Sequence, residues 1–213
     1  MTYSEKHIYI IRHGETDYNK SGYLQGSTIN SSLNDRGKKQ AHAFFEHYKS
    51  IPFDKIYTSV LKRSIESVDE FVNLGIPIEH HIELNEINWG KFEGKKLTIA
   101  ATYRINRIIN KWKEGKTDLE IPGGDSPNDL EKRQKKVIDL IFSRPEEQNI
   151  LISMHGRAMR IFICQLMQLS LSKMDQYKHD NLALYHLFFK AENLKPILIA
   201  NNDILHLEKT NFK

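Results

Sequence analysis

Cysteine is almost missing from this chain of 213 residues, because Cys164 is its single copy. One cysteine cannot form an intrachain disulfide, so a disulfide-stabilised framework is excluded. Cys164 lies within the apolar run RIFICQLM, which favours a small buried side chain over a reactive thiol. A chain of this length with 39% hydrophobic residues can instead build a full apolar core.

Long apolar runs are also missing. No run approaches the roughly 18 to 20 residues that a helix needs to cross a bilayer. The first residues, MTYSEKHIYII, lack the basic segment, the long apolar stretch and the small-residue cleavage site of a signal peptide. The sequence therefore predicts a cytoplasmic protein that does not bind a membrane.

Clusters of positive charge are absent, although the chain carries a formal net charge of +4. Lysine and arginine are dispersed, with no long basic run or basic-aromatic motif, so nucleic acid is not an expected partner. The excess positive charge can instead raise the concentration of a small anion near a cleft. No Cys, His or Asp cluster has the spacing of metal ligands, so no metal site is expected.

Repeats, low-complexity tracts and linkers are absent as well, which predicts a single domain over residues 1–213. Strand and helix patterns alternate along the chain and favour an α/β layered fold. The predicted strands are 7–11, 53–59, 149–154, 182–190 and 196–200. The predicted helices are 35–50, 61–75, 125–142 and 156–169.

The segment 91–125 is less regular at its ends and is expected to form a flap or insertion over the active site. The helix after it has a clear start. Ser126 can cap it, Pro127 suits its first turn, and Asp129 can complete a capping box.

Two histidines follow apolar strands in the same way. The stretch IYIIRHGETDYN (8–19) places Arg12 and His13 directly after a strand, and NILISMHG (149–156) ends on His155 and Gly156. In open α/β sheets, ligand sites lie beyond the carboxyl ends of the strands, so both histidines are expected at one edge. A charge buried there needs a partner.

Other segments bring suitable chemistry to this edge. VLKRS carries Arg63, and LNEINWGKFEG carries Glu86. The paired donors of arginine fit phosphate oxygens, and a neutral imidazole can attack phosphorus and carry the phosphoryl group. Nearby cations keep such an imidazole deprotonated. A carboxylic acid beside a phosphate can protonate the leaving alcohol. These residue types suit a phosphomonoester, which is the partner that the buried charges need.

In order along the chain, the segments RHGETDYN, LQGSTINSSLNDRG, TSVLKRSIES, NEINWGKFEG, PGGDS and MHG resemble the histidine phosphatase (phosphoglycerate mutase-like) superfamily. The resemblance implies a three-layer α/β/α sandwich with a mostly parallel central sheet. It also implies catalysis with no metal or other cofactor, in which His13 is the phosphorylated nucleophile and Glu86 the proton donor.

The resemblance extends to a substrate-binding set around the phosphoryl group. Its members are Arg12, Asn19, Gln25, Gly26, Ser27, Arg63, Glu86, His155 and Gly156. For residues 25–27, a plain loop is the alternative to a phosphate-lining role. The chain departs from the family pattern at Val60, Ser64 and Met154, where other residue types are more usual.

The favoured function is hydrolysis of a small phosphorylated metabolite. A phosphoglycerate mutase would use the same phosphohistidine, but mutases of this superfamily carry longer inserts and a covering C-terminal tail. A non-catalytic phospholigand-binding module would be expected to have lost a catalytic residue. Arg104, Arg107 and Lys111 share a helical face, which is either simply solvated or a second anion contact above the phosphate. Oligomeric state is open, with a homodimer among the alternatives.

Overall fold

The computed structural model describes residues 5–191 and 195–208. Its strands are β1 (Lys6–Arg12), β2 (Lys55–Thr58), β3 (Ile78–His80), β4 (Asn149–Met154), β5 (Leu184–Phe189) and β6 (Ile197–Asp203). They form one sheet in the order β3-β2-β4-β1-β5-β6. Strands β1 to β4 pair in parallel, whereas β5 is antiparallel to both β1 and β6. The mostly parallel sheet is therefore confirmed.

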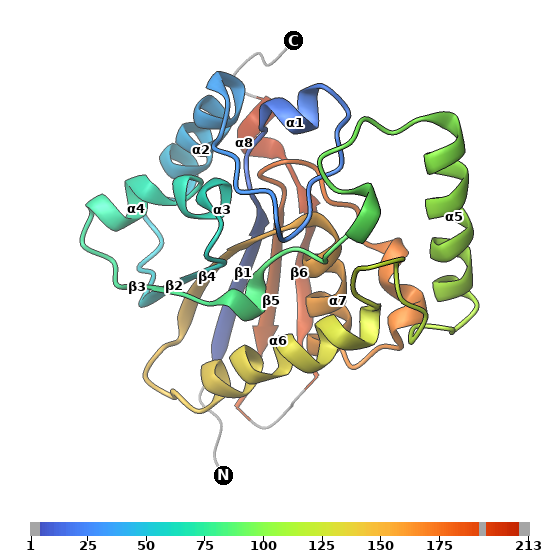
Figure 1. Ribbon diagram of the computed structural model, residues 1–213. Coiled ribbons are helices and arrows are strands. Elements are labelled where there is room, and N and C mark those ends of the chain that lie inside the picture. The colour runs from blue at the N-terminus through green and yellow to red at the C-terminus, as the bar shows by residue number, and fades with distance from the viewer. Residues whose placement is uncertain (1–4, 192–194, 209–213) are drawn as a thin grey trace.

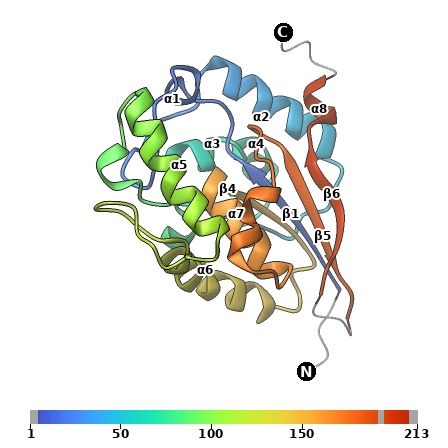
Figure 2. The same cartoon turned by 90° about the vertical axis from the view of Figure 1, so that its right-hand side faces the viewer.

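Helices cover both faces of this sheet. The α-helices are α1 (Asp17–Lys20), α2 (Asp35–Tyr48), α3 (Lys62–Glu66), α4 (Asp69–Asn73), α5 (Ile99–Lys113), α6 (Pro127–Phe142), α7 (Gly156–Leu166) and α8 (Leu205–Glu208). The 3-10 helices are η1 (Ile82–Leu84), η2 (Gly90–Phe92) and η3 (Leu171–Gln176). Helices α5, α6 and α7 lie on one side of the sheet and α2 and α8 on the other (Figure 1, Figure 2). This arrangement is the predicted three-layer sandwich.

Strand β1 contributes side chains to two separate cores. Ile8 and Ile10 pack in the core that includes residues of α6 and α7, and Tyr9 and Ile11 pack in the core that includes residues of α2 and α4. Successive side chains of a strand point to opposite faces of a sheet. A strand that is apolar on both faces must therefore be covered on both, which fixes the layers.

Helix α6 begins where its capping signals predict. The Ser126 hydroxyl oxygen accepts a hydrogen bond from the Asp129 N–H at 3.2 Å, and the Asp129 carboxylate accepts one from the Ser126 N–H at 2.9 Å. Both halves of the capping box are thus formed. Helix α6 supplies one side of the larger core through residues such as Leu130 and Val137.

The predicted helix over residues 61–75 is instead two short helices, α3 and α4. The Ser67 hydroxyl donates to the Arg63 carbonyl oxygen at 2.6 Å and accepts from the Gly14 N–H at 2.9 Å. At the next residue, Val68 has φ −128° and ψ 6°, which is not helical. The apolar spacing continues across the break, so periodicity alone predicted one helix. Strand β3 was also missed, since it has only three residues.

Some expectations concern the whole chain. No helix in the two described ranges is long and apolar enough to cross a membrane. The same residues contain no group of three or more His, Cys, Asp or Glu side chains that could hold a metal ion. Cys164 is buried in α7, and this burial raises the pKa of its thiol to about 12. Residues 1–4 and 209–213, on which the expectations about the chain ends partly fall, lie outside the described residues.

Candidate active site

The two predicted histidines meet at the carboxyl ends of neighbouring parallel strands. His13 follows β1. Its main-chain N–H donates to the carbonyl oxygen of Met154, the last residue of β4, at 3.0 Å. His155 follows Met154 directly. The two imidazole rings have centroids 5.2 Å apart and planes inclined at 54°. Strands β1 and β4, which are neighbours in the sheet, therefore deliver both rings to one of its edges.

His13 is held in one tautomer by its neighbour. Its side chain is buried, with 3% of the residue exposed, and Nδ1 lies 2.7 Å from the Gly14 carbonyl oxygen. A carbonyl oxygen can only accept, so Nδ1 carries the proton and Nε2 keeps its lone pair. Burial, followed by the positive charges of Arg63 and Arg12, lowers the pKa of His13 well below its ordinary value. The ring is therefore neutral at physiological pH.

His155 is completely buried and is fixed by β2. Its Nε2 lies 2.7 Å from the hydroxyl oxygen of Ser59, the residue after β2. Its Nδ1 is buried and has no hydrogen-bond partner among the described residues. Burial, then the charge of Arg63, and then His13 and Arg12, lower the pKa of His155 well below its ordinary value. A second neutral ring thus lies beside His13 with one nitrogen still unpaired.

The two predicted arginines are both held by main-chain carbonyl oxygens. Arg12 Nη1 donates to the His179 carbonyl at 2.7 Å. Arg63 is fully buried, and its two terminal nitrogens donate to the carbonyls of Ile29 at 2.5 Å and Gly26 at 3.2 Å. Burial is the main cause that lowers the pKa of Arg63 to about 10. The Nε of each arginine is buried and, within the described chain, has no partner.

Glu86 lies at the N-terminal end of α7. Its carboxylate accepts hydrogen bonds from three main-chain N–H groups: Ile87 at 2.9 Å, Arg157 at 3.0 Å and Ala158 at 2.8 Å. Arg157 and Ala158 belong to the first turn of α7, where N–H groups have no partner within the helix. Glu86 therefore closes this helix end while it lies at the same edge of the sheet as His155, the residue before α7.

The other predicted residues contribute mainly through the loop architecture. Asn19 Oδ1 accepts from the Thr16 N–H at 3.3 Å in the capping box of α1, which leaves its Nδ2 available to donate. The Gln25 side chain donates to the Thr16 hydroxyl at 2.6 Å and accepts from Ser31 at 2.5 Å, so both of its ends are used within the protein. Half-buried Ser27 lies in the same loop.

Two glycines of the predicted set lie where a side chain would crowd its neighbours. A Cβ on Gly26 would lie 1.9 Å from Glu93 Oε1, and one on Gly156 would lie 3.1 Å from the ring of His179. Gly26 also supplies one of the carbonyls that hold Arg63. The Gly26 loop thus lies close to Glu93, and the start of α7 lies close to His179.

A family model described as the histidine phosphatase superfamily (branch 1) matches residues 8–202. The chain belongs to the histidine phosphatase superfamily. Among curated histidine phosphatases, it is 29% identical over 197 residues to phosphoserine phosphatase 1 of Hydrogenobacter thermophilus, which covers 91% of both chains. It is also 29% identical over 172 residues to a 2,3-bisphosphoglycerate-dependent phosphoglycerate mutase of Cytophaga hutchinsonii, covering 76% of this chain and 78% of that protein.

Solved structures agree on the fold of this histidine phosphatase. A mycobacterial glucosyl-3-phosphoglycerate phosphatase superposes with a TM-score of 0.79 at 21% identity, covering 94% of this chain and all of that one (100%). At this identity the likeness concerns the fold alone. The phosphatases among the curated relatives support a phosphatase activity for this chain.

Several residues at the site were not singled out from the sequence. Asn181 Nδ2 donates to the His13 carbonyl at 2.8 Å, and Arg133 Nη2 donates to the carbonyls of Asn85 at 2.9 Å and Glu86 at 3.3 Å. Neither residue follows a strand or a glycine-rich motif, so no local signal indicated it. Ser59 could have been predicted, since it is the first residue after a strand that ends at this edge.

The departures from the family pattern do not remove a catalytic group. The Ser64 hydroxyl donates to the Ser153 carbonyl at 2.5 Å and so joins α3 to β4. Met154 is buried and uses its carbonyl to hold His13, whereas Val60 is 40% exposed. Ser64 and Met154 thus help to hold the segments around the histidine pair, whereas Val60 is largely at the surface.

Proposed function

We propose that this protein hydrolyses small phosphomonoesters through a phosphohistidine formed on His13. The observation that supports this most is the state of the His13 ring. Its Nδ1–H is committed to the Gly14 carbonyl, burial and two arginines favour its neutral form, and Nε2 therefore keeps a lone pair. A buried neutral imidazole beside two fixed cations is suited to attack a phosphate that those cations hold.

Unpaired donors near His13 support binding of an anion. Arg12 Nε, Arg63 Nε and His155 Nδ1 are buried without partners in the part of the chain that the structure describes. Buried polar groups are normally paired, and those that are not call for an explanation such as an absent ligand. We expect a phosphoryl group to provide acceptors for this set. The positive charges then stabilise its oxygens throughout the reaction.

The reaction proceeds in two displacements. His13 Nε2 attacks phosphorus, a P–N bond forms, and the bond to the ester oxygen breaks while protonated Glu86 gives its proton to the leaving alcohol. A water then attacks phosphorus, Glu86 accepts its proton, and the P–N bond breaks to release phosphate. The first displacement therefore requires Glu86 to carry a proton, and the second returns that proton to it.

A phosphoglycerate mutase is the second candidate, and the match to a mutase of Cytophaga hutchinsonii favours keeping it. That match covers 76% of this chain, whereas the match to phosphoserine phosphatase 1 covers 91% at the same 29% identity. We therefore favour hydrolysis. A phosphorylated metabolite as substrate, the cytoplasm as location, and the absence of cofactor, nucleic-acid and membrane partners stay predictions.

The test measures phosphate release from a panel of phosphomonoesters in the presence of a chelator at mildly acidic pH. The panel contains phosphoserine and 3-phosphoglycerate, and isomerisation of 3-phosphoglycerate is followed in parallel. We expect release with at least one ester, and a fall on the order of 10³ or more in His13→Ala because the covalent route is lost.

The matched control is His42→Ala, which removes an exposed imidazole paired with Glu70 and should keep the parent rate. Isomerisation without net release would make the protein a mutase. Tight binding of a phospholigand without turnover or phosphohistidine would indicate a non-catalytic binding module. A near-parental rate in His13→Ala would disprove the nucleophile.

A further inference from the structure

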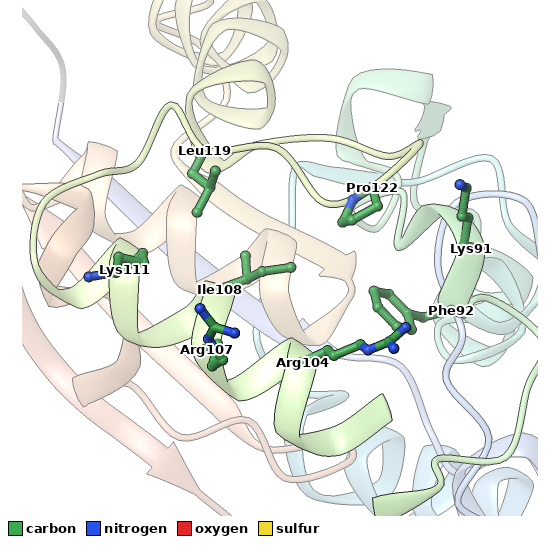
Figure 3. A pocket seen from close by; sticks show the side chains of 8 residues that line it. All are labelled: Lys91, Phe92, Arg104, Arg107, Ile108, Lys111, Leu119 and Pro122. Carbon is green, nitrogen blue, oxygen red and sulfur yellow. The ribbon is translucent and has the colours of Figure 1, made fainter. Parts of the chain in front are cut away.

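A cavity lies outside the catalytic set. It has a volume of about 430 Å³ and lies between α5, η2 and the chain around residues 119–122, as Figure 3 shows. Pockets that bind small molecules usually measure about 300 to 1,000 Å³. None of the proposed catalytic or substrate-binding residues lines this cavity. We call it the α5 pocket.

The α5 pocket carries positive charge that the protein does not neutralise. Arg104 and Arg107 line it from one face of α5, together with Lys111 and with Lys91 of η2. Lys111 extends away from the centre in Figure 3 and pairs with Glu114 at 2.7 Å. No carboxylate lines the pocket, and no ion pair to either arginine occurs within residues 5–191 and 195–208. The two guanidinium groups are therefore available to an external anion.

The remaining lining is apolar. Phe92, Ile108, Leu119 and Pro122 complete the pocket, and the Arg104 side chain extends toward Phe92 (Figure 3). The fully buried Trp112 donates from its indole nitrogen to the Leu119 carbonyl at 2.8 Å, which joins the end of α5 to the opposite wall. This hydrogen bond fixes the two walls of the pocket relative to each other. A bare inorganic anion would leave its apolar surface uncovered.

We propose that the α5 pocket binds an organic anion with an apolar or aromatic body and a charged group held by Arg104 and Arg107. Guanidinium groups bind sulfonate, carboxylate and phosphate oxygens through charge-assisted hydrogen bonds. The apolar body covers Phe92, Ile108 and Leu119 and gains the free energy of removing that surface from water. This site is independent of the proposed hydrolysis, because it shares no residue with the catalytic set.

The test compares two fluorescent probes that share an aromatic body and differ in charge. 8-Anilino-1-naphthalenesulfonate carries a sulfonate, and N-phenyl-1-naphthylamine carries none. We expect the intact protein to bind the sulfonate probe in a 1:1 complex at least about tenfold more tightly than the neutral probe. The Arg104→Gln/Arg107→Gln variant should lose at least about tenfold in affinity for the sulfonate probe and keep its affinity for the neutral one.

The matched control is Lys38→Gln/Lys39→Gln, which removes the same charge from exposed positions of α2 and should bind both probes as the parent does. Saturating orthovanadate, a phosphate mimic for the His13 site, should not displace the sulfonate probe. Displacement would place the probe in the catalytic centre and overturn the proposal. Unchanged sulfonate binding in the arginine variant, or equal affinity for both probes, would overturn it as well.

Discussion

Glu86 combines a structural and a chemical task. Its carboxylate accepts three main-chain N–H groups, two of them in the first turn of α7, and the proposed reaction also requires it to carry a proton. In Glu86→Gln, the amide nitrogen cannot accept, so at least one buried N–H loses its partner at a cost of about 1–3 kcal/mol. That cost affects every substrate equally. The informative quantity is therefore the loss in kcat/KM for one substrate relative to the loss for another.

We therefore predict that Glu86→Gln lowers kcat/KM for phosphoserine at least about tenfold more than for p-nitrophenyl phosphate. The alkoxide of serine is a poor leaving group and needs the proton, whereas p-nitrophenolate leaves without it. Steady-state kinetics on both esters, with thermal unfolding as a check on folding, provide the measurement. An equal loss on the two substrates would contradict the acid role.

Ser59 and Ser64 offer a matched pair within one short stretch of the chain. Both are fully buried, but the Ser59 hydroxyl pairs with His155 Nε2 at 2.7 Å and the Ser64 hydroxyl with the Ser153 carbonyl. Ser59→Ala should lower kcat/KM on the order of tenfold, because His155 loses the contact that orients its ring. Ser64→Ala should reduce the free energy of unfolding with little change in kcat/KM. Similar kinetic losses in both variants would argue against a positioning role for Ser59.

The sequence predicted which residue types gather at this site but not how each is used. His13 and His155 could be placed because both follow apolar strands whose ends meet. The direction of the Arg63 side chain could not be predicted, because it depends on the carbonyls of Gly26 and Ile29 in a loop distant in sequence. Asn181 was missed for the same reason, since its contact with His13 spans most of the chain.

Among the elements, the central strands were predicted more closely than the helices beside them. Strands β1 and β4 are buried on both faces, so uninterrupted apolar runs identify them. The break between α3 and α4 instead lies beside Ser67, whose hydroxyl pairs with the Gly14 N–H and the Arg63 carbonyl. A contact between two loops leaves no periodic signal in the sequence.

We predict that Ser67→Ala destabilises the fold by about 1–3 kcal/mol, because the buried Gly14 N–H loses its acceptor. It should also lower kcat/KM, since Gly14 fixes the tautomer of His13 through its carbonyl. The comparison is Ser126→Ala at the start of α6, where loss of a helix cap costs about 1 kcal/mol. Urea unfolding and phosphate release would be measured for both. Activity lost equally in the two variants would indicate a general effect of destabilisation.

Buried histidines occur outside the candidate active site as well as within it, and their burial affects the stability of the entire domain. His13, His155 and His206 are each no more than 3% exposed. Burial is the first cause that lowers all three pKa values, that of His206 to about 4. His206 lies on α8, where its ring packs against Phe44 and Tyr48 with centroids 5.2 and 5.6 Å apart. These contacts attach the C-terminal helix to α2.

The unfolded chain protonates histidine near pH 6.5, whereas these folded histidines resist protonation until a lower pH. Below about pH 6.5 the unfolded state therefore binds more protons, and the free energy of unfolding falls as the pH falls. Each such histidine contributes at most about 1.4 kcal/mol per pH unit in this window. The contributions of three such histidines add up to a sizeable part of the roughly 5–15 kcal/mol free energy of unfolding of a typical domain.

We predict that the free energy of unfolding falls by several kcal/mol between pH 7.5 and 5.5. His206→Phe, which keeps an aromatic ring against Phe44 and Tyr48, should lose up to about 1.4 kcal/mol less over the same interval, because one histidine no longer titrates in the unfolded chain. Urea unfolding at both pH values, for the parent and for His206→Phe, measures the difference. Since His206 is not one of the proposed catalytic or substrate-binding residues, His206→Phe should retain phosphatase activity at pH 5.5, where the neutral His13 remains able to attack. A parental pH slope in His206→Phe would show that His206 does not resist protonation in the folded protein.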